Sequence, residues 1–277
     1  MPFPDFDHSL THQDRVLGLL LGGSLGDALG APIRLMSKVT IDRSGAGAAL
    51  VSRQAKVGAV TELTCSMLAT VREANRHGPR TLAEAFETPA MDKVSRNLEA
   101  LVSAGPIGLF EECAFDVGFE TAARAGGDLE CKVAAGLFAD WVQCASEGRA
   151  HGAAIFSRNH NRCELWRIGE VDALAIEILR SGADVFGDHV SQASLGIGYT
   201  PRSALLLALW AIARADSPLD ALHRGLYISG PSHVVGSLVG QVLGAHLGAS
   251  WIPPELLSQL NLTEATSLAA EAQIPSG

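Results

Sequence analysis

The chain has 277 residues, 47% of them hydrophobic, which is enough to bury the core of one large domain. Its net charge of −9 and the lack of any lysine or arginine cluster argue against nucleic acid as a partner. Aromatic residues make up only 5% of the chain, and runs of alternating β-branched and aromatic residues are missing. Strands therefore have little support, and we expect an all-α protein.

The N-terminal residues MPFPDFDHSL lack a basic segment followed by an apolar core, so we expect no signal peptide. The apolar run from Val16 to Gly26 is too short to cross a membrane, which takes ~20 residues. The cysteines, at positions 65, 113, 131, 144 and 163, include no C-x-x-C pair. They indicate reduced thiols in a cytoplasmic protein, and no zinc site.

Capping residues, glycines and prolines mark the expected helix boundaries. Thr11 and Asp14 predict a capped start for the first helix, and Pro32 ends it. Pro201 opens a strongly apolar helix, and Ser217 with the proline that follows opens the next. In chain order we expect helices at residues 11–30, 61–77, 81–87, 91–103, 106–124, 128–147, 164–181, from 201, at 217–229 and at 231–248, with a last turn after Pro254.

Between these helices we expect long loops over residues 37–58 and 148–163, and loose ends at residues 1–10 and 273–277. No segment of disordered composition divides the chain. Residues 1–277 should therefore form a single domain of roughly a dozen helices.

Two series of glycines, four residues apart, suggest which helices lie at the centre. They are glycines 18, 22, 26 and 30, and glycines 236, 240, 244 and 248. On a helix this spacing places each series on one face. Every glycine costs roughly 1 kcal/mol of helix stability relative to alanine, so a close backbone contact must compensate. We predict that the two helices pack glycine face to glycine face; the alternative is that each packs against other helices.

Several segments carry a family resemblance. They are LGLLLGGSLGDALGAP at 17–32, GPIGLF at 105–110, GIGYTPRSALLLALWAI at 196–212, and the run from Gly230 through GQVLGAHLGASWIP. In this order they resemble the signatures of the ADP-ribosylglycohydrolases, which include the dinitrogenase reductase-activating glycohydrolase. The resemblance implies a compact, all-α orthogonal helical bundle. It also implies hydrolysis of the bond between ADP-ribose and a protein side chain or small molecule.

The resemblance further implies two magnesium or manganese ions held by carboxylates, the ligands that such cations prefer. The chain departs from the family at each ligand segment. Arg34 stands where a carboxylate follows Gly-Ala-Pro. The family's Thr-Asp-Asp-Thr string reads Thr61-Glu62-Leu63-Thr64, and its Gly-Asp-x-Asp-Thr string reads Gly230-Pro231-Ser232-His233-Val234. Only Glu62 is still a carboxylate, so we expect no metal site and no cofactor.

By the same resemblance, the ligand-binding cleft comprises Asp27, Arg34, Thr61, Glu62, Thr64, Gly105, Gly198, Tyr199, Ser232 and His233. No catalytic set is intact among them, and Glu62 and His233 are the remaining candidates for acid–base chemistry. Each has a structural alternative. Asp27 could bond nearby backbone amides, His233 could cap or pack, and Glu62 could simply favour the start of a helix.

Two further expectations concern charge. Glu99 lies where the family approaches the pyrophosphate, and its carboxylate would repel that group. Arg34 should pair with Glu62, directly or through one water, in place of the missing ions. The alternative is that Arg34 extends into solvent.

Three functions are compatible with these residues. The leading hypothesis is a pseudoenzyme that binds an unknown protein or small-molecule partner. The first alternative is an active hydrolase that removes ADP-ribose from modified targets with a rebuilt site. The second is a metal-independent enzyme that uses the same cleft.

Overall fold

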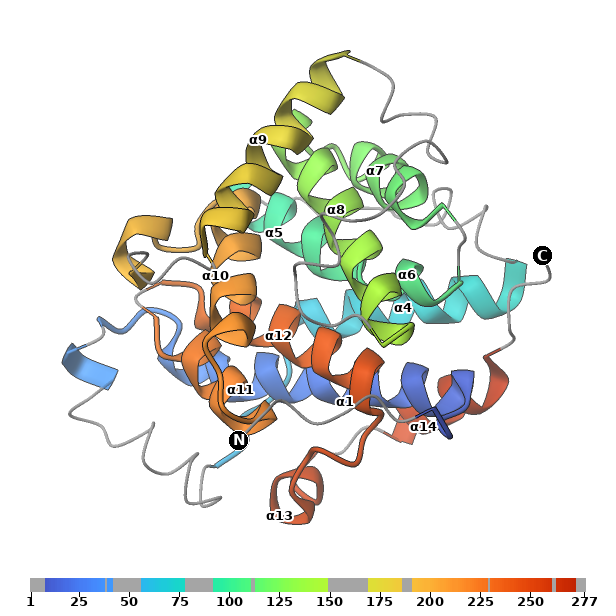
Figure 1. Ribbon diagram of the computed structural model, residues 1–277. Coiled ribbons are helices and arrows are strands. Elements are labelled where there is room, and N and C mark those ends of the chain that lie inside the picture. The colour runs from blue at the N-terminus through green and yellow to red at the C-terminus, as the bar shows by residue number, and fades with distance from the viewer. Residues whose placement is uncertain are drawn as a thin grey trace.

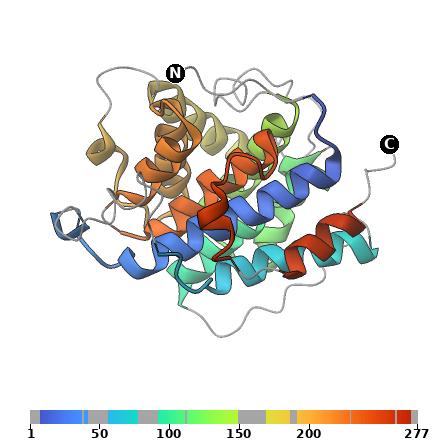
Figure 2. The same ribbon diagram turned by 90° about the horizontal axis from the view of Figure 1, so that it is seen from below.

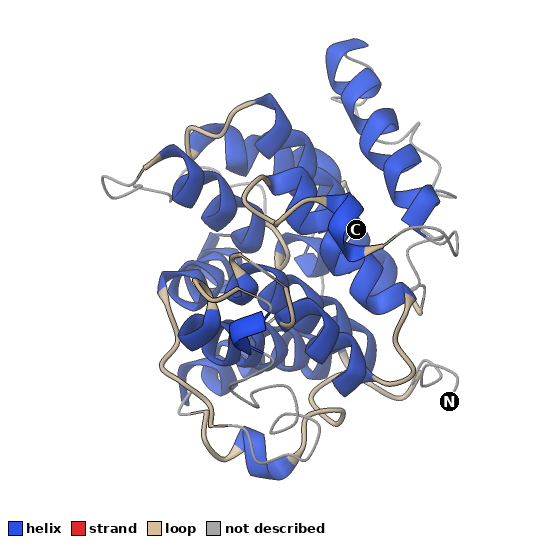
Figure 3. Cartoon of the chain, turned by 90° about the vertical axis from the view of Figure 1, so that its left-hand side faces the viewer, coloured by secondary structure: helices blue, strands red, loops and turns tan. Residues whose placement is uncertain are grey.

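The computed structural model describes residues 8–37, 39–41, 56–77, 92–110, 113–148, 169–185, 191–228, 230–260 and 263–272. These residues form helices and turns, with no strand among them (Figure 3). The expected all-α bundle is confirmed. The elements are α1 (His12–Gly30), η1 (Ala31–Ile33), α4 (Glu62–His77), α5 (Lys93–Ser103), α6 (Ile107–Phe110), α7 (Ala114–Arg124), α8 (Leu129–Ser146), α9 (Gly169–Val185), η6 (Gln192–Leu195), α10 (Pro201–Ala213), α11 (Pro218–Leu226), α12 (Ser232–Leu247), α13 (Pro254–Leu257) and α14 (Thr263–Glu271).

Helices α1 and α12 run side by side through the middle of the protein, as predicted (Figures 1 and 2). Their glycine faces touch. A Cβ atom added to Gly26 would lie 2.0 Å from the carbonyl oxygen of Gly236, and one added to Gly244 would lie 2.0 Å from that of Gly18. No Cβ fits at such distances, so glycine is required for this antiparallel contact.

The start of α1 is fixed by its own cap and by the far end of α12. Thr11 and Asp14 form the expected capping box. Buried Arg15 donates through Nη1 to the carbonyl oxygens of Ala245 and His246, each at 3.0 Å. The last carbonyl groups of a helix lack intrahelical hydrogen-bond partners and carry partial negative charge. A guanidinium at this position donates hydrogen bonds to them and compensates that charge.

Helix α8 forms the second buried layer above this pair (Figure 1). Asp128 caps its start, as predicted, by accepting the Cys131 N–H at 3.0 Å. Asn97 on α5 donates to the same carboxylate at 3.1 Å and so ties α5 to α8. The buried amide of Gln241 on α12 donates to the Val102 carbonyl at 3.1 Å, which joins α12 to the end of α5.

The expected single helix over residues 106–124 is instead two helices, α6 and α7. A Cβ atom on Gly108 would lie 2.2 Å from the carbonyl oxygen of Ala139, and one on Gly118 would lie 3.0 Å from that of Ala135. Along a straight helix the two glycines would be ~15 Å apart, whereas their partners on α8 are only ~6 Å apart. The chain must therefore turn between them to place both against α8.

Helix α14 lies beyond the last turn expected from the sequence, packed on α1 and α4 (Figure 2). Its buried residues are Ala265, Leu268 and Ala269. Two alanines and one leucine give only a weak periodic pattern of apolar residues, so the sequence does not predict this helix. The expected helix at 81–87, all but the first residue of the loop at 148–163, and the tail at 273–277 lie outside the described residues.

One stretch of the described chain, His12–Ile33, is long and apolar enough to cross a membrane by length and composition alone. Within its most apolar window, 78% is buried inside the protein. Because its glycine face is covered by α12, we treat this stretch as the core helix of the fold.

Candidate functional site

The candidate site lies where the last turn of α1, the start of α4 and the start of α12 meet; we call this region the junction. Asp27 on α1 is fully buried there. One of its carboxylate oxygens accepts from the Thr61 N–H and the Thr64 hydroxyl, both at 2.7 Å, and the other accepts from the Thr61 hydroxyl at 2.8 Å. The Thr61 hydroxyl oxygen in turn accepts from the Leu63 N–H at 3.2 Å. Asp27 thus fixes the first turn of α4. This is the structural role that the sequence suggests as the alternative to ligand binding.

The start of α12 meets the end of α1 at a single glycine. A Cβ atom on Gly30 would lie 2.3 Å from the Cα of His233. Ser232 is fully buried, and its hydroxyl lies 3.4 Å from the carbonyl oxygens of Ile228 and Gly230. The structure therefore packs the first residues of α12 against the last turn of α1, the turn that follows Asp27.

The His233 imidazole is half-buried, and its Nδ1 atom has no hydrogen-bond partner among the described residues. Burial lowers the pKa of His233 below its ordinary value; Arg34 acts in the same direction, whereas Asp27 and Glu62 oppose the shift. The side chain is therefore neutral at neutral pH. The same charges show that Arg34 and Glu62 lie near this imidazole.

Arg34 and Glu62 are both exposed. No ion pair joins them in the described part of the chain, so the expected direct pairing is wrong. Arg34 lies at the end of the 3₁₀ turn that follows α1, and its side chain extends into solvent. The junction thus presents one cation and one carboxylate that remain open to other groups.

The turn over residues 196–200 lies against the segment that leads into α12. Gly230 has a φ of 126°, and a Cβ atom there would lie 2.2 Å from the Ile197 carbonyl oxygen and 3.6 Å from Cε2 of Tyr199. Gly198 lies against the Pro231 ring, 3.4 Å from its Cγ by the same construction. Tyr199 is exposed at the edge of the junction.

Gly105 does not belong to this group. It is buried in the core, where an added Cβ atom would lie 1.9 Å from Oε1 of Gln241 and 2.7 Å from Cε1 of Phe138. Gln241 lies eight residues beyond His233, or ~12 Å along α12. The geometry does not support the expected placement of Gly105 in the cleft. Its role is to let the α5–α6 turn approach α12.

Sequence reasoning did not identify the contact between Ser66 and Glu99. The Ser66 hydroxyl, one turn after Glu62 on α4, donates to Oε1 of Glu99 on α5. The other carboxylate oxygen of Glu99 is buried without a hydrogen-bond partner among the described residues. The i, i+4 spacing of Glu62 and Ser66 indicates that these two side chains lie on the same face of α4. The sequence contains no comparable signal for the contact with Glu99 on α5.

The residues present do not fit two divalent cations. Leu63 and Val234, at two of the implied ligand positions, are 6% and 1% exposed and belong to the apolar core. Pro231 has no side-chain donor, and both oxygens of Asp27 are already occupied. Within the described residues, no group of three or more His, Cys, Asp or Glu side chains could hold a metal ion.

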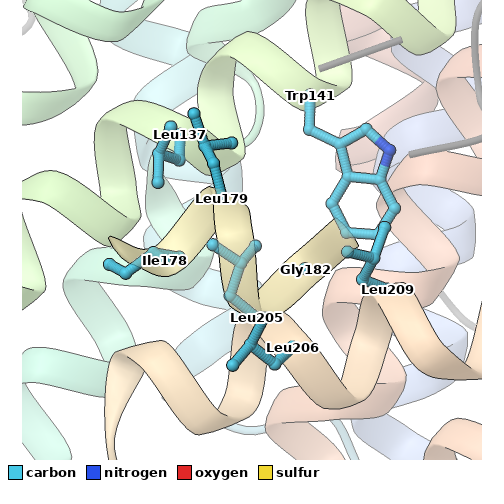
Figure 4. Close-up of a pocket in the computed structure, with 8 residues that line it drawn as sticks. All are labelled: Leu137, Trp141, Ile178, Leu179, Gly182, Leu205, Leu206 and Leu209. Atoms are coloured by element: carbon cyan, nitrogen blue, oxygen red, sulfur yellow. The ribbon is translucent and has the colours of Figure 1, made fainter. Parts of the chain in front are cut away.

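A small cavity lies away from the junction, between α8, α9 and α10 (Figure 4). Its volume is about 20 Å³, and its walls are Trp141, Gly182, Ile178 and five leucines. A cavity of this size holds at most a water molecule, and apolar walls leave such a water without partners. It is a packing gap and not a ligand site.

Comparison with known proteins agrees with this architecture. Residues 8–96 and 69–275 match the model of the family described as ADP-ribosylglycohydrolase. No curated protein matches the chain. A solved structure named as an "ADP-ribosylglycohydrolase-related protein complex" superposes with a TM-score of 0.69 at 22% identity, over 94% of this chain and 97% of that one. At this identity, the structural likeness shows the fold alone.

Proposed function

The chain belongs to the ADP-ribosylglycohydrolase family, and from that premise we propose that it is a member without the dinuclear metal centre, which binds a protein partner or small ligand at the junction. The observation that carries the proposal is the burial of Leu63 and Val234 in the apolar core. Neither side chain can coordinate a cation, and a carboxylate placed in either position would be desolvated by its neighbours.

Exposed apolar side chains around the junction support a partner. Of the six large apolar residues that are exposed in the described part of the chain, three belong to segments beside the junction: Leu35, Ile197 and Tyr199. Apolar groups clustered at a surface are typical of interaction sites. The similar solved structure is named as a protein complex, which agrees with a partner for this chain as well.

A second candidate function rests on Glu62 and His233. The carboxylate and the neutral imidazole act on each other electrostatically, and one is exposed while the other is half-buried. A neutral imidazole beside a carboxylate can accept and return a proton near neutral pH. This pair could support a hydrolysis that needs no metal.

An assay of ADP-ribose release from a peptide with ADP-ribosylated arginine separates these functions. We expect no release with magnesium, with manganese or with a chelator, while a metal-dependent member of the family releases ADP-ribose under the same conditions. Release that a chelator abolishes would contradict the proposal. Release that is indifferent to chelator, and that Glu62→Gln or His233→Gln abolishes while Glu120→Gln on α7 does not, would establish the second function.

A further inference from the structure

A second, larger pocket lies at the opposite end of α4. It has a volume of about 520 Å³ and is lined by Gln13, Asn75, Arg76 and residues 270–272. Arg76 lies fourteen residues beyond Glu62, so the pocket is ~21 Å from the junction along the helix. Its volume is in the range of small-molecule sites, roughly 300–1,000 Å³. The proposed function assigns no role to this pocket.

The pocket lies at the end of a seam between α4 and α14, which run side by side (Figure 2). Along this seam Arg72 pairs with Glu264, and Asn75 donates to the Leu268 carbonyl at 2.8 Å. Contacts therefore advance in the same direction on both helices, so the helices are parallel. Their last turns both end at the pocket.

The next acid and base along the seam remain apart. Arg76 and Glu271 both line the pocket, and no ion pair between them occurs in the described residues. Arg76 instead pairs with Glu73 on its own helix, at 3.5 Å between Nη1 and Oε1, and the Arg76 side chain is 61% exposed. The two helices are thus joined by the Arg72–Glu264 ion pair, whereas Arg76 and Glu271 line the same pocket without an ion pair to each other.

The wall of the pocket is polar, and a hydrogen bond fixes part of it. Gln13 donates through Nε2 to the Ala270 carbonyl at 2.9 Å, which fixes the end of α14 to the start of α1. Oδ1 of Asn75 has no hydrogen-bond partner among the described residues, and a buried acceptor of this kind calls for an explanation. The C-termini of α4 and α14 both add partial negative charge at the pocket, and that of α14 lies beside Glu271.

We propose that this pocket binds a small zwitterion of the free amino acid class. Its carboxylate binds the Arg76 guanidinium, and its ammonium group lies towards Glu271 and the C-terminal end of α14. A guanidinium and a carboxylate that line one pocket without pairing with each other complement the two charges of such a ligand. A simple anion would use Arg76 alone, and a simple cation would use Glu271 alone. This inference is independent of the activity at the junction.

Saturation-transfer NMR with the twenty free amino acids, followed by calorimetry of the strongest, tests the proposal on the full chain. We expect at least one amino acid to bind saturably. Its N-acetyl and its carboxamide derivatives, each of which lacks one charge, should bind at least about tenfold more weakly, as expected for loss of a hydrogen bond to a charged group. The proposal is overturned if no amino acid saturates the protein, or if either derivative binds as well as the parent.

Variants locate the site. Arg76→Gln and Glu271→Gln should each weaken binding at least about tenfold, because each removes one charged partner. Arg124→Gln and Glu120→Gln, two exposed side chains on α7, should leave the dissociation constant unchanged. Both pocket residues are exposed, so the variants should fold, and an unchanged melting temperature checks this. Binding that survives both substitutions would place the ligand elsewhere and refute the assignment.

Discussion

Gly22 of α1 and Gly240 of α12 face each other with no space for a side chain on either. A Cβ atom on Gly240 would lie 1.9 Å from the Gly22 carbonyl oxygen, and one on Gly22 would lie 2.2 Å from the Gly240 carbonyl oxygen. The contact is therefore reciprocal. The close packing of the two backbones compensates for the low helix propensity of glycine.

Gly240→Ala should destabilise the protein although alanine favours helices. The added methyl group must displace the backbone of α1, and overpacking of this kind costs ~1–3 kcal/mol. Urea unfolding measures the loss. The matched control is Gly169→Ala at the start of α9, where no atom lies within 4 Å of an added Cβ. If both variants unfold like wild type, the central glycine contact is not a determinant of stability.

Asp27→Asn should loosen the start of α4. The amide retains one acceptor oxygen, whereas three donors from Thr61 and Thr64 now point at the group. A hydrogen bond to a charged group contributes ~1.5–3 kcal/mol, so a drop in melting temperature of several degrees is expected. Faster amide hydrogen exchange at Thr61–Thr64 would locate the effect. Asp216→Asn, at an exposed carboxylate, serves as the control, and equal exchange in the two variants would contradict the role of Asp27.

Magnesium and manganese at millimolar concentration should not raise the melting temperature. A ligand at about a hundred times its dissociation constant stabilises a protein by about 2.7 kcal/mol, which at ~2–4 °C per kcal/mol is a rise of several degrees. Leu63 and Val234 cannot supply the ligands that such binding needs. Differential scanning fluorimetry with and without chelator checks the expectation, and a rise that the chelator reverses would show a metal site.

The pH dependence of stability should include a share from His233. Burial lowers the pKa of this imidazole below its ordinary value of 6.5 in the folded protein. As the pH falls below about 6.5, the unfolded chain takes up a proton that the folded protein resists, so stability decreases. His233→Gln should make this decrease shallower in urea unfolding between about pH 7 and pH 5, roughly the titration range of histidine. Parallel curves for the two proteins would show that His233 does not contribute.

Arg34 and Glu62 should act independently. A double-mutant cycle with Arg34→Met and Glu62→Gln measures their coupling, and exposed pairs typically give ~0–1 kcal/mol even when they are in contact. Because no ion pair joins them, we expect a coupling energy below about 0.5 kcal/mol. A coupling well above about 1 kcal/mol would mean that the two charges meet in solution.

The sequence was sufficient to predict the features that depend on local chemistry. The glycine spacing led to the α1–α12 contact, and Thr11, Asp128 and Pro201 marked helix starts that the structure retains. The division between α6 and α7 could not be predicted, because it follows from the distance between two contacts on α8. That distance is a tertiary property, and no local signal in the chain encodes it.

The site was predicted only in part, for a similar reason. The segments of the junction were identified, but their side-chain partners were not. Asp27 bonds Thr61, which lies 34 residues away, and Gly105 packs against Gln241 instead of facing a ligand. A motif indicates which segments assemble, whereas the direction of each side chain depends on packing across the whole fold.

The bond from Arg15 to Ala245 spans 230 residues of sequence, and this separation has a consequence for biosynthesis. Helix α1 leaves the ribosome long before its partner α12 exists. At a synthesis rate of ~5–20 residues per second, its apolar, glycine-rich surface waits roughly 10–50 s for a cover. Formation of the native core is therefore a late event, because long-range pairs form only after the intervening chain is complete. We expect the nascent chain to need a chaperone during that interval.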